Sequence, residues 1–477
     1  MGKYDTVIGL EVHTQLSTKT KVFCACRNVF GEKPNSCVCP VCLGHPGSLP
    51  VLNKKAFEYA IKVALALDCG IQKIIKFDRK NYYYPDLPKN YQISQYDMPI
   101  AYKGKIVIAD ENENPKTIGV TRAHLEEDAG KLIHDTAGSF SYVDLNRTGT
   151  PLLEIVSEPE ISSPEEAYRY LVELKRIIKY LGVSDCNMEE GSLRCDANIS
   201  LKPSGSLQLG SKVEIKNLNS FKAVKEALTY EIARQGEVLD EGGTIAQQTR
   251  LWDEKCGITI SMRSKEEAQD YRYFPEPDLV PFEVDDNVIQ SIKNFLPELP
   301  AAKKERFRVE YGLSENDIDV MVSERDIADF FERTVKEYPN AKAVSNWIKG
   351  EVLMHVNEKG KDISSLGISP EDLADIVKMT ISGRISALSA KDVLKKAIDT
   401  GEKPSDIVTK GAMEQVSDTA SLESVVSRVI SENEKSVNDY LSGKEAALSF
   451  LVGQVMKFSK GKANPKVAGE MLRKRLK

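Results

Sequence analysis

Acidic side chains recur on the polar faces of several strand-like segments in the first half of the chain. In the alternating run 6–16, Glu11 and His13 are two residues apart, so both point to one side of an extended strand. Four further strand-like runs each carry an acid: Glu127, Glu154, Asp196 and Glu214. In one sheet, such carboxylates would suit Mg²⁺ and phosphoryl transfer. Alternatively, each strand has only a solvated face, and both interpretations stay open.

Five of the nine cysteines lie within 19 residues, in segment 24–42. Four of them follow the pattern Cys24-x-Cys26-x₁₂-Cys39-x₂-Cys42, whose spacing suits a tetrahedral zinc ion. We predict a structural Zn²⁺ site, because sulfur fills all four positions. No GxxxxGK[ST] motif occurs, which excludes a P-loop nucleotide site.

A tyrosine- and lysine-rich segment, 76–99, shows neither strand nor helix periodicity. It interleaves cations such as Lys80 and Lys89 with rings such as Tyr82. Long irregular segments inside a compact domain are usually functional, so this one could line a polar passage or stack on bases. A tyrosine-rich interface loop is the alternative, and the sequence alone does not separate the two.

Strands mixed with a few helices must position these residues, which indicates an α+β body. The clearest helix begins with Ser163 as its cap, Pro164 in the first position and Glu166 completing a capping box, and it ends at Gly182. An earlier helix, 54–68, follows the cap Asn53. Strands are also expected over 191–201 and 212–218.

The pattern becomes almost entirely helical after Pro297-Glu298-Leu299-Pro300, with serine caps that recur along the chain. We expect these caps at Ser314, Ser323, Ser369 and Ser389. A second break covers 401–405. The sequence therefore predicts an α+β body over 1–294 with the Cys-rich segment 24–42, an all-α domain over 295–405 and a small helical tail domain over 406–477.

The charge of the chain is unevenly distributed. Its net charge of −6 argues against a nucleic-acid partner, yet from Val408 onward 12 Lys or Arg face 8 Asp or Glu. The last 21 residues hold eight basic side chains and one acid. A basic end on an acidic body indicates a local polyanion contact, with a solvated helix face as the alternative. The sequence shows no apolar run near 18 residues and no secretory h-region, so we expect a cytoplasmic protein without membrane helices.

Long motifs along the whole chain resemble one known family, the B subunit of the bacterial aspartyl/glutamyl-tRNA amidotransferase. The motifs are YDTVIGLEVHTQL (4–16), FDRKNYYYPDLPKNYQISQYDMPI (77–100), HLEEDAGK (124–131), VDLNRTGTPLLEIVSEP (143–159), MEEGSLRCDANIS (188–200), DYRYFPEPDL (270–279) and FLVGQVMKFSKGKANP (450–465). The resemblance implies a cradle domain related to glutamine synthetase, with a mixed or antiparallel sheet, followed by a helical domain and a tRNA-binding tail.

The resemblance also implies the chemistry. Such a protein uses ATP and Mg²⁺ to phosphorylate the side-chain carboxylate of misacylated Glu-tRNA(Gln) or Asp-tRNA(Asn), and ammonia then displaces the phosphate, so the enzyme is a carbon–nitrogen ligase. By resemblance, the catalytic set is Glu11, His13, Glu127, Glu154, Asp196 and Glu214, the first four holding Mg²⁺. The ammonia path includes Lys80, Tyr82 and Lys89. Basic side chains of the tail would contact tRNA: Lys457, Lys460, Lys462, Lys466, Arg473, Lys474 and Arg475.

The resemblance further implies partners. An amidase, the A subunit, makes the ammonia from glutamine, and a small C subunit completes a heterotrimer. Two rival interpretations differ in testable ways. A self-contained carboxylate–amine ligase would need no tRNA, and a non-enzymatic tRNA-binding assembly protein would hydrolyse no ATP.

Overall fold

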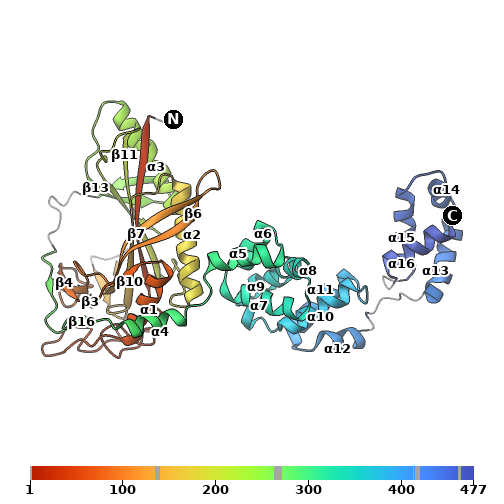
Figure 1. The fold of residues 1–477 in the computed structure, drawn as a ribbon, viewed down its shortest axis with the longest axis horizontal. Coiled ribbons are helices and arrows are strands. Elements are labelled where there is room, and N and C mark those ends of the chain that lie inside the picture. The colour runs from red at the N-terminus through yellow and green to blue at the C-terminus, as the bar shows by residue number, and fades with distance from the viewer. Residues whose placement is uncertain are drawn as a thin grey trace. The chain divides into compact units, whose positions relative to one another are not determined.

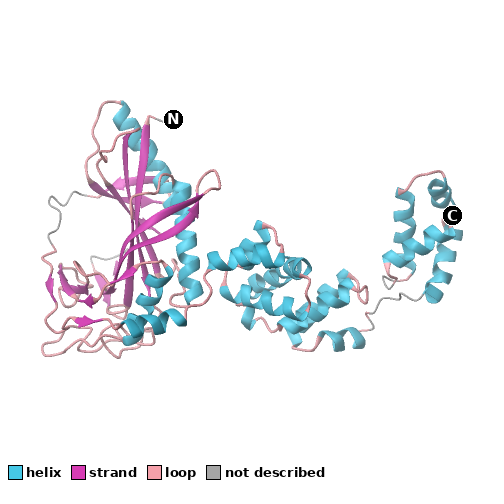
Figure 2. Ribbon diagram, in the orientation of Figure 1, coloured by secondary structure: helices cyan, strands magenta, loops and turns pink. Residues whose placement is uncertain are grey.

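A computed structural model describes residues 3–134, 140–262, 271–411, 413, 419–459 and 463–476. The chain divides into two compact units, Met1–Pro300 and Ala301–Lys477. The strands described lie in the first unit, which we call the body, and the described part of the second unit is helical (Figures 1 and 2). This confirms the predicted α+β class with a helical C-terminal region. The further division near residue 405 stays a prediction.

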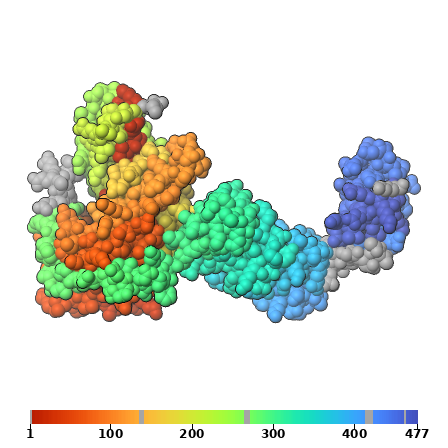
Figure 3. Space-filling view, in the orientation of Figure 1, coloured from red at the N-terminus to blue at the C-terminus, as the bar shows by residue number. Residues whose placement is uncertain are grey.

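Nine strands form the main sheet of the body. They are β1 (Tyr4–Gln15), β2 (Gly70–Ile71), β6 (Ala101–Ala109), β7 (Pro115–Glu127), β10 (Pro151–Ser157), β11 (Leu193–Pro203), β12 (Val213–Leu218), β13 (Gln248–Asp253) and β14 (Ile258–Ser261). Their order is β14-β13-β12-β11-β1-β10-β7-β6-β2. Neighbouring strands are antiparallel except β12 and β13. The strand with Glu11 and His13 is thus central, and the β6–β7 hairpin projects from the surface in orange (Figure 3).

Three helices pack on the apolar face of this sheet and share its core: α1 (Lys54–Ala66), α2 (Pro164–Leu181) and α3 (Phe221–Asp240). As predicted, the Ser163 hydroxyl accepts a hydrogen bond from the Glu166 backbone N–H at the start of α2, and Gly182 ends it in the left-handed conformation. The predicted capping box is incomplete. The Glu166 carboxylate accepts instead from the Ser162 backbone N–H at 2.8 Å and binds Lys116.

The tyrosine- and lysine-rich segment 76–99 is more regular than the sequence predicted. It contributes β4 (Asp78–Asn81) and β5 (Tyr91–Ser94) to a three-stranded sheet with β15 (Phe274–Pro275). The strand β15 pairs in register with β4 from almost 200 residues further along the chain, which local periodicity cannot reveal. Two more strand pairs complete the body: β3 (Ile74–Ile75) with β16 (Phe282–Glu283), and β8 (Lys131–His134) with β9 (Ser141–Asp144).

Helices account for most of the chain after the strands. They are α4 (Asp286–Asn294) in the body, then α5 (Pro300–Tyr311), α6 (Glu315–Met321), α7 (Arg325–Glu337), α8 (Ala341–Trp347), the π-helix η1 (Ile348–Val352), α9 (Leu353–Lys359), the 3₁₀ helix η2 (Ile363–Ser365), α10 (Pro370–Ile381), α11 (Ala387–Thr400), α12 (Pro404–Lys410), α13 (Thr419–Glu432), α14 (Glu434–Leu441), α15 (Ala446–Phe458) and α16 (Pro465–Arg475). Among the described helices, none is long and apolar enough to span a membrane.

Two of the four predicted serine caps are confirmed. Ser314 caps α6, and Ser369 forms a complete capping box at the start of α10. The other two predictions are wrong: α7 follows Glu324 without a side-chain cap, and Ser386 rather than Ser389 caps α11. The last helices, α13 to α16, share a separate apolar core that includes Leu451 and Leu472.

Candidate active site

The central strands bring two glutamates and two histidines together on the polar face of the sheet. In the register of β1, β10 and β7, His13 lies opposite Glu154, and Glu154 lies opposite His124. Glu126 follows His124 by two residues and faces the same way. His13 Nε2 is 3.1 Å from Glu154 Oε2 and 3.9 Å from Glu126 Oε1. His124 Nε2 is 3.2 and 3.5 Å from carboxylate oxygens of the same two acids. We call these four residues the His/Glu cluster.

The electrostatics of the His/Glu cluster keep its acids charged. Burial opposes ionisation, but the neighbouring imidazoles outweigh it and lower the pKa of both Glu154 and Glu126. Burial also opposes protonation of the histidines, but the two carboxylates raise the pKa of His13 and bring that of His124 to about 9. The two acids are therefore anionic at neutral pH, and a cation bound through His13 would take the place of the proton that this imidazole otherwise holds.

The donor atoms of the His/Glu cluster fit one divalent metal ion. Ligand atoms of His13, Glu126 and Glu154 lie within 4.8 Å of one another. Two carboxylates and an imidazole leave room in the coordination sphere for water and phosphate oxygens, as Mg²⁺ sites in proteins usually do. Glu126 also accepts a hydrogen bond of 2.9 Å from the Ser94 hydroxyl, which fixes its orientation. The site therefore has the negative charge that a metal ion requires, and a hydrogen bond that orients one of the ligands.

The structure does not bring Glu127 to the His/Glu cluster, although the sequence analysis placed it among the Mg²⁺ ligands. Adjacent residues of a strand point to opposite faces, so Glu127 points away from the side that carries Glu126. Its carboxylate forms an ion pair with Lys89 and accepts a 2.9 Å hydrogen bond from the Ile93 backbone N–H. Glu126 lies where Glu127 was predicted, and it was not among the predicted site residues.

Glu11, Asp196 and Glu214 share the polar face but lie outside the group of close metal-ligand atoms. Glu11 is paired in register with Asp196, and its carboxylate accepts a hydrogen bond of 2.8 Å from the Asn198 amide. Lys216 Nζ lies 2.8 Å from Asp196 Oδ2 and 3.0 Å from Glu214 Oε1. These residues continue the charged surface of the His/Glu cluster across β11 and β12, with Lys216 between two of the acids.

Arg194 and Asp128 form an ion pair beside the His/Glu cluster, and neither was among the predicted site residues. Arg194 lies opposite His13 in the strand register. Its guanidinium donates to Asp128 Oδ2 at 2.7 Å, and the Gln15 amide donates to the same oxygen at 2.8 Å. The Arg194 Nε atom is buried and has no hydrogen-bond partner within the described ranges. Arg194 shares a two-residue period with Asp196, which was a usable signal, whereas its pairing with Asp128 needs the fold.

The three residues predicted along the ammonia path flank both glutamates of β7. Lys80 Nζ lies 4.7 Å from the ring centroid of Tyr271 and 5.8 Å from that of Tyr82. Burial disfavours the Lys80 ammonium, but the charge of Glu126 and the neighbouring tyrosines raise its pKa. Lys80 therefore stays charged near the His/Glu cluster. The third residue, Lys89, pairs with Glu127 instead.

The four predicted zinc ligands meet in the loop between β1 and α1. The sulfur atoms of Cys24, Cys26, Cys39 and Cys42 lie within 4.8 Å of one another, and all four thiols are free. The Cys39 backbone N–H donates to the Cys42 sulfur at 3.1 Å, and the buried Lys21 ammonium lies 3.7 Å from it. A hydrogen bond with Cys24, helped by these two groups, lowers the pKa of Cys42 to about 4. The arrangement fits a tetrahedral Zn²⁺ ion.

The predicted tRNA contacts of the tail are exposed where the structure describes them. Lys457 lies on α15 and Lys466 on α16, both on the surface. The last turn of α16 carries three more exposed cations, Arg473, Lys474 and Arg475. The Arg475 guanidinium already forms an ion pair with the Glu423 carboxylate, at 2.7 Å. Two further predicted contacts, Lys460 and Lys462, lie outside the described residues.

Comparison with known proteins identifies the family. Residues 6–290 match the GatB/GatE catalytic domain, and residues 329–476 match the GatB domain. The chain belongs to the GatB family. It is 54% identical over 479 residues to the B subunit of the aspartyl/glutamyl-tRNA(Asn/Gln) amidotransferase of Carboxydothermus hydrogenoformans, covering 100% of this chain and 99% of that one. The proteins of the same name from Thermoanaerobacter pseudethanolicus and Caldanaerobacter subterraneus are 54% and 55% identical, each over 99% of both chains.

Membership of the GatB family confirms the predicted enzyme class. The relatives are B subunits of tRNA-dependent amidotransferases, which are ligases that use glutamine as the amide donor. The first family match covers the main sheet from residue 6 onward, including the His/Glu cluster and the four cysteines. The second covers the last helices and their basic surface.

Proposed function

We propose that this GatB-family protein uses ATP to phosphorylate the side-chain carboxylate of Glu-tRNA(Gln), Asp-tRNA(Asn) or both, and that ammonia then displaces the phosphate. The observation that carries the proposal is the His/Glu cluster, in which two buried anionic carboxylates and an imidazole converge on one point. Phosphoryl transfer needs groups that hold a metal ion beside the phosphates, because positioning and charge neutralisation account for most of its catalysis.

His13, Glu126 and Glu154 would hold the Mg²⁺, which would neutralise the phosphate charges and allow the substrate carboxylate to approach them. His124 contacts both acids through one nitrogen and holds their carboxylates in place. The side chains of Arg194 and Lys216, on the neighbouring strands β11 and β12, supply positive charge on the same face of the sheet. They are therefore suited to orient the anionic substrates.

Lys80, Tyr82 and Lys89 would then guide ammonia to the activated carboxylate. Lys80 lies between aromatic rings and carries a charge that Glu126 supports. Ammonium has no lone pair and cannot attack, so its proton must pass to a carboxylate along the path, and Glu127 beside Lys89 is such a group. We infer that the ammonia comes from an amidase, the A subunit, within a heterotrimer that also contains a small C subunit.

The other predicted sites complete the proposal. The four cysteines would hold a structural Zn²⁺, and the exposed cations of α15 and α16 would contact the phosphates of tRNA. Aminoacyl-tRNA is the substrate, so we place the reaction in the cytoplasm.

ATP hydrolysis by the assembled heterotrimer, with misacylated tRNA present or absent, tests the proposal. Glu126→Gln and Glu154→Gln should each reduce tRNA-dependent hydrolysis by about 100-fold or more, because each removes a charge from the site. The matched control is Glu226→Gln on α3, whose carboxylate pairs with surface Lys222. Hydrolysis that survives both cluster variants would leave a tRNA-binding role without kinase activity. Amidation of a free carboxylate without tRNA would instead support the self-contained ligase.

A further inference from the structure

The Cys-rich loop touches Lys89 at a glycine. Gly44 adopts a left-handed φ of +69°, and a Cβ atom added there would lie 2.3 Å from Lys89 Cγ and 3.2 Å from Lys89 Cβ. No heavy atom can approach another so closely without displacement. The loop backbone at Gly44 is therefore the surface against which the stem of Lys89 lies.

The same turn supplies two of the four sulfurs. Backbone hydrogen bonds join Leu43 to Cys39 at 3.0 Å and Gly44 to Val41 at 3.1 Å, so the turn closes tightly around Cys42. Gly44 stands only two residues after Cys42 in the chain. Any ion that ties this turn to the other two cysteines also fixes the position of Gly44.

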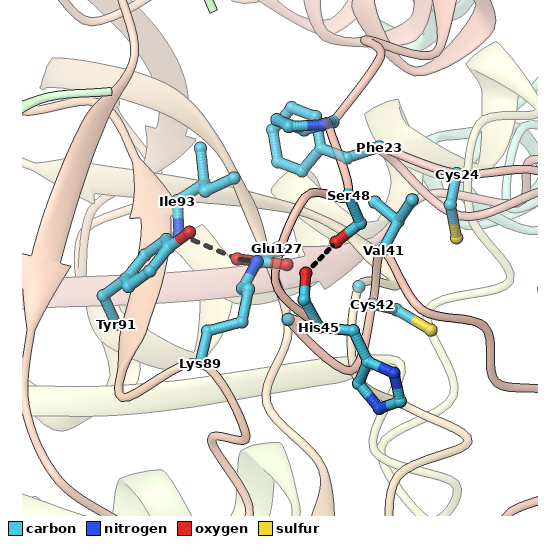
Figure 4. Close-up of a pocket in the computed structure, with 13 residues that line it drawn as sticks. Phe23, Cys24, Val41, Cys42, His45, Ser48, Lys89, Tyr91, Ile93 and Glu127 are labelled. Atoms are coloured by element: carbon cyan, nitrogen blue, oxygen red, sulfur yellow. Dashed lines mark hydrogen bonds and ion pairs between the residues drawn. The ribbon is translucent and has the colours of Figure 1, made fainter. Parts of the chain in front are cut away.

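Lys89 and Glu127 share a cavity with the thiols. The Lys89 side chain is 6% exposed and that of Glu127 is 2% exposed. In Figure 4 this ion pair lies beside Tyr91, and Cys24 and Cys42 approach from the opposite side. Residues of the Cys-rich loop, among them Cys42 and Gly44, line one side of this cavity, and Lys89 and Glu127 line another. The loop thus closes one side of the space around the ion pair.

We propose that the Cys-rich loop, held by its metal, positions Lys89 against Glu127 through the contact at Gly44. The inference rests on the proposed zinc site and gives that site a task beyond general stability. Gly44 and Cys42 are positioning residues in this proposal, because both act through Lys89. The loop determines where the Lys89 ammonium lies, and with it one wall of the proposed ammonia path.

Lysine labelling of the assembled heterotrimer tests this proposal without measuring activity. An amine-reactive ester is applied to the zinc-loaded and the chelator-stripped enzyme, metal content is measured, and labelled lysines are quantified by mass spectrometry. The labelling rate of Lys89 should rise by about tenfold on stripping, because local opening exposes it. Lys76 is the internal control, since its partners Asp78 and Asp97 lie outside the loop. An unchanged Lys89 rate in fully stripped enzyme would overturn the proposal, and so would a chain that never binds zinc.

A pair of glycine variants covers the case in which stripping unfolds the body. Gly44→Ala and Gly47→Ala both place a side chain at left-handed φ in the same segment, but a Cβ atom at Gly47 would meet no described heavy atom within 4 Å. In zinc-loaded enzyme, Gly44→Ala should raise Lys89 labelling and Gly47→Ala should not. Equal rates in the two variants would overturn the contact at Gly44. Because tRNA-dependent ATP hydrolysis is measured separately, failure here is distinguishable from failure of the proposed function.

Discussion

Replacing Glu127 by glutamine should destabilise the body while leaving the His/Glu cluster intact. The change leaves the buried Lys89 ammonium without its countercharge, whereas the new amide oxygen can still accept from the Ile93 backbone N–H. Removing one partner of a buried ion pair costs about 3–5 kcal/mol, and the retained hydrogen bond favours the lower end, about 3 kcal/mol. At about 2 °C per kcal/mol for a large domain, the Tm should fall by about 6 °C.

Thermal unfolding of the assembled heterotrimer, followed together with tRNA-dependent ATP hydrolysis, measures both effects. Glu126→Gln is the matched variant on the adjacent residue, and it should abolish hydrolysis with a smaller change in Tm. The double variant Lys89→Gln/Glu127→Gln removes both charges and should recover most of the lost stability. An unchanged Tm for Glu127→Gln, with hydrolysis lost as completely as in Glu126→Gln, would refute the assignment of the two glutamates to opposite faces.

Three further predictions concern other parts of the chain. His124→Phe should weaken Mg²⁺-dependent ATP hydrolysis by about 10–100-fold, and His124→Gln should recover part of it by restoring an N–H donor; a titration of hydrolysis against Mg²⁺ measures this. Asp317, whose pKa is lowered by hydrogen bonds from Lys342 and Lys349, stabilises the helical unit above its ordinary pKa of 3.8, and the contribution is lost as the pH falls through the lowered value. Asp317→Asn should therefore cost about 2 kcal/mol at pH 7 and less at pH 3, as denaturant unfolding at both pH values would show. Lys466→Gln and Lys474→Gln should each reduce the salt slope of tRNA binding by about 1, whereas loss of binding without a change in slope would contradict phosphate contacts.

The sequence could predict those parts of the site whose geometry is local. The spacing of four cysteines within 19 residues was sufficient to predict that their sulfur atoms lie close together, as they do in the structure. His13 could be placed on the same face as Glu11 because a two-residue period fixes relative orientation within one strand. The end of β7 offered the same guide. Leu125 is apolar, so the two-residue period puts Glu127 on the core face and Glu126 on the polar face with His124, a signal that the prediction of Glu127 did not use.

Long-range pairing accounts for the rest of what the sequence could not show. Arg194 is on β11 and Asp128 directly follows β7, and the two meet only because the sheet places no more than β1 and β10 between these strands. The short strand β4 pairs with the nearby β5 and with β15, which begins at residue 274, and only the pairing with β15 was beyond the reach of the local sequence. Helix caps, too, could be predicted only where they depend on neighbouring residues. Ser163 and Ser369 were predictable from neighbouring residues, whereas Glu166 was diverted from its capping box by Lys116, which lies 50 residues earlier.

Side chains alternate between the two faces of the sheet along β7, and this alternation determines where residues can be inserted or deleted. The β6–β7 turn, around Asp110 and Asn114, lies on the surface at the far end of the hairpin from the His/Glu cluster, so residues can be gained or lost there without altering the cluster. One residue inserted between Leu125 and Glu126 would turn the carboxylates over, with one sent into the core and the other toward the metal ligands. Two inserted residues would restore the facing of both. Natural length variation in this family should therefore collect at the turn and be absent from the strand end.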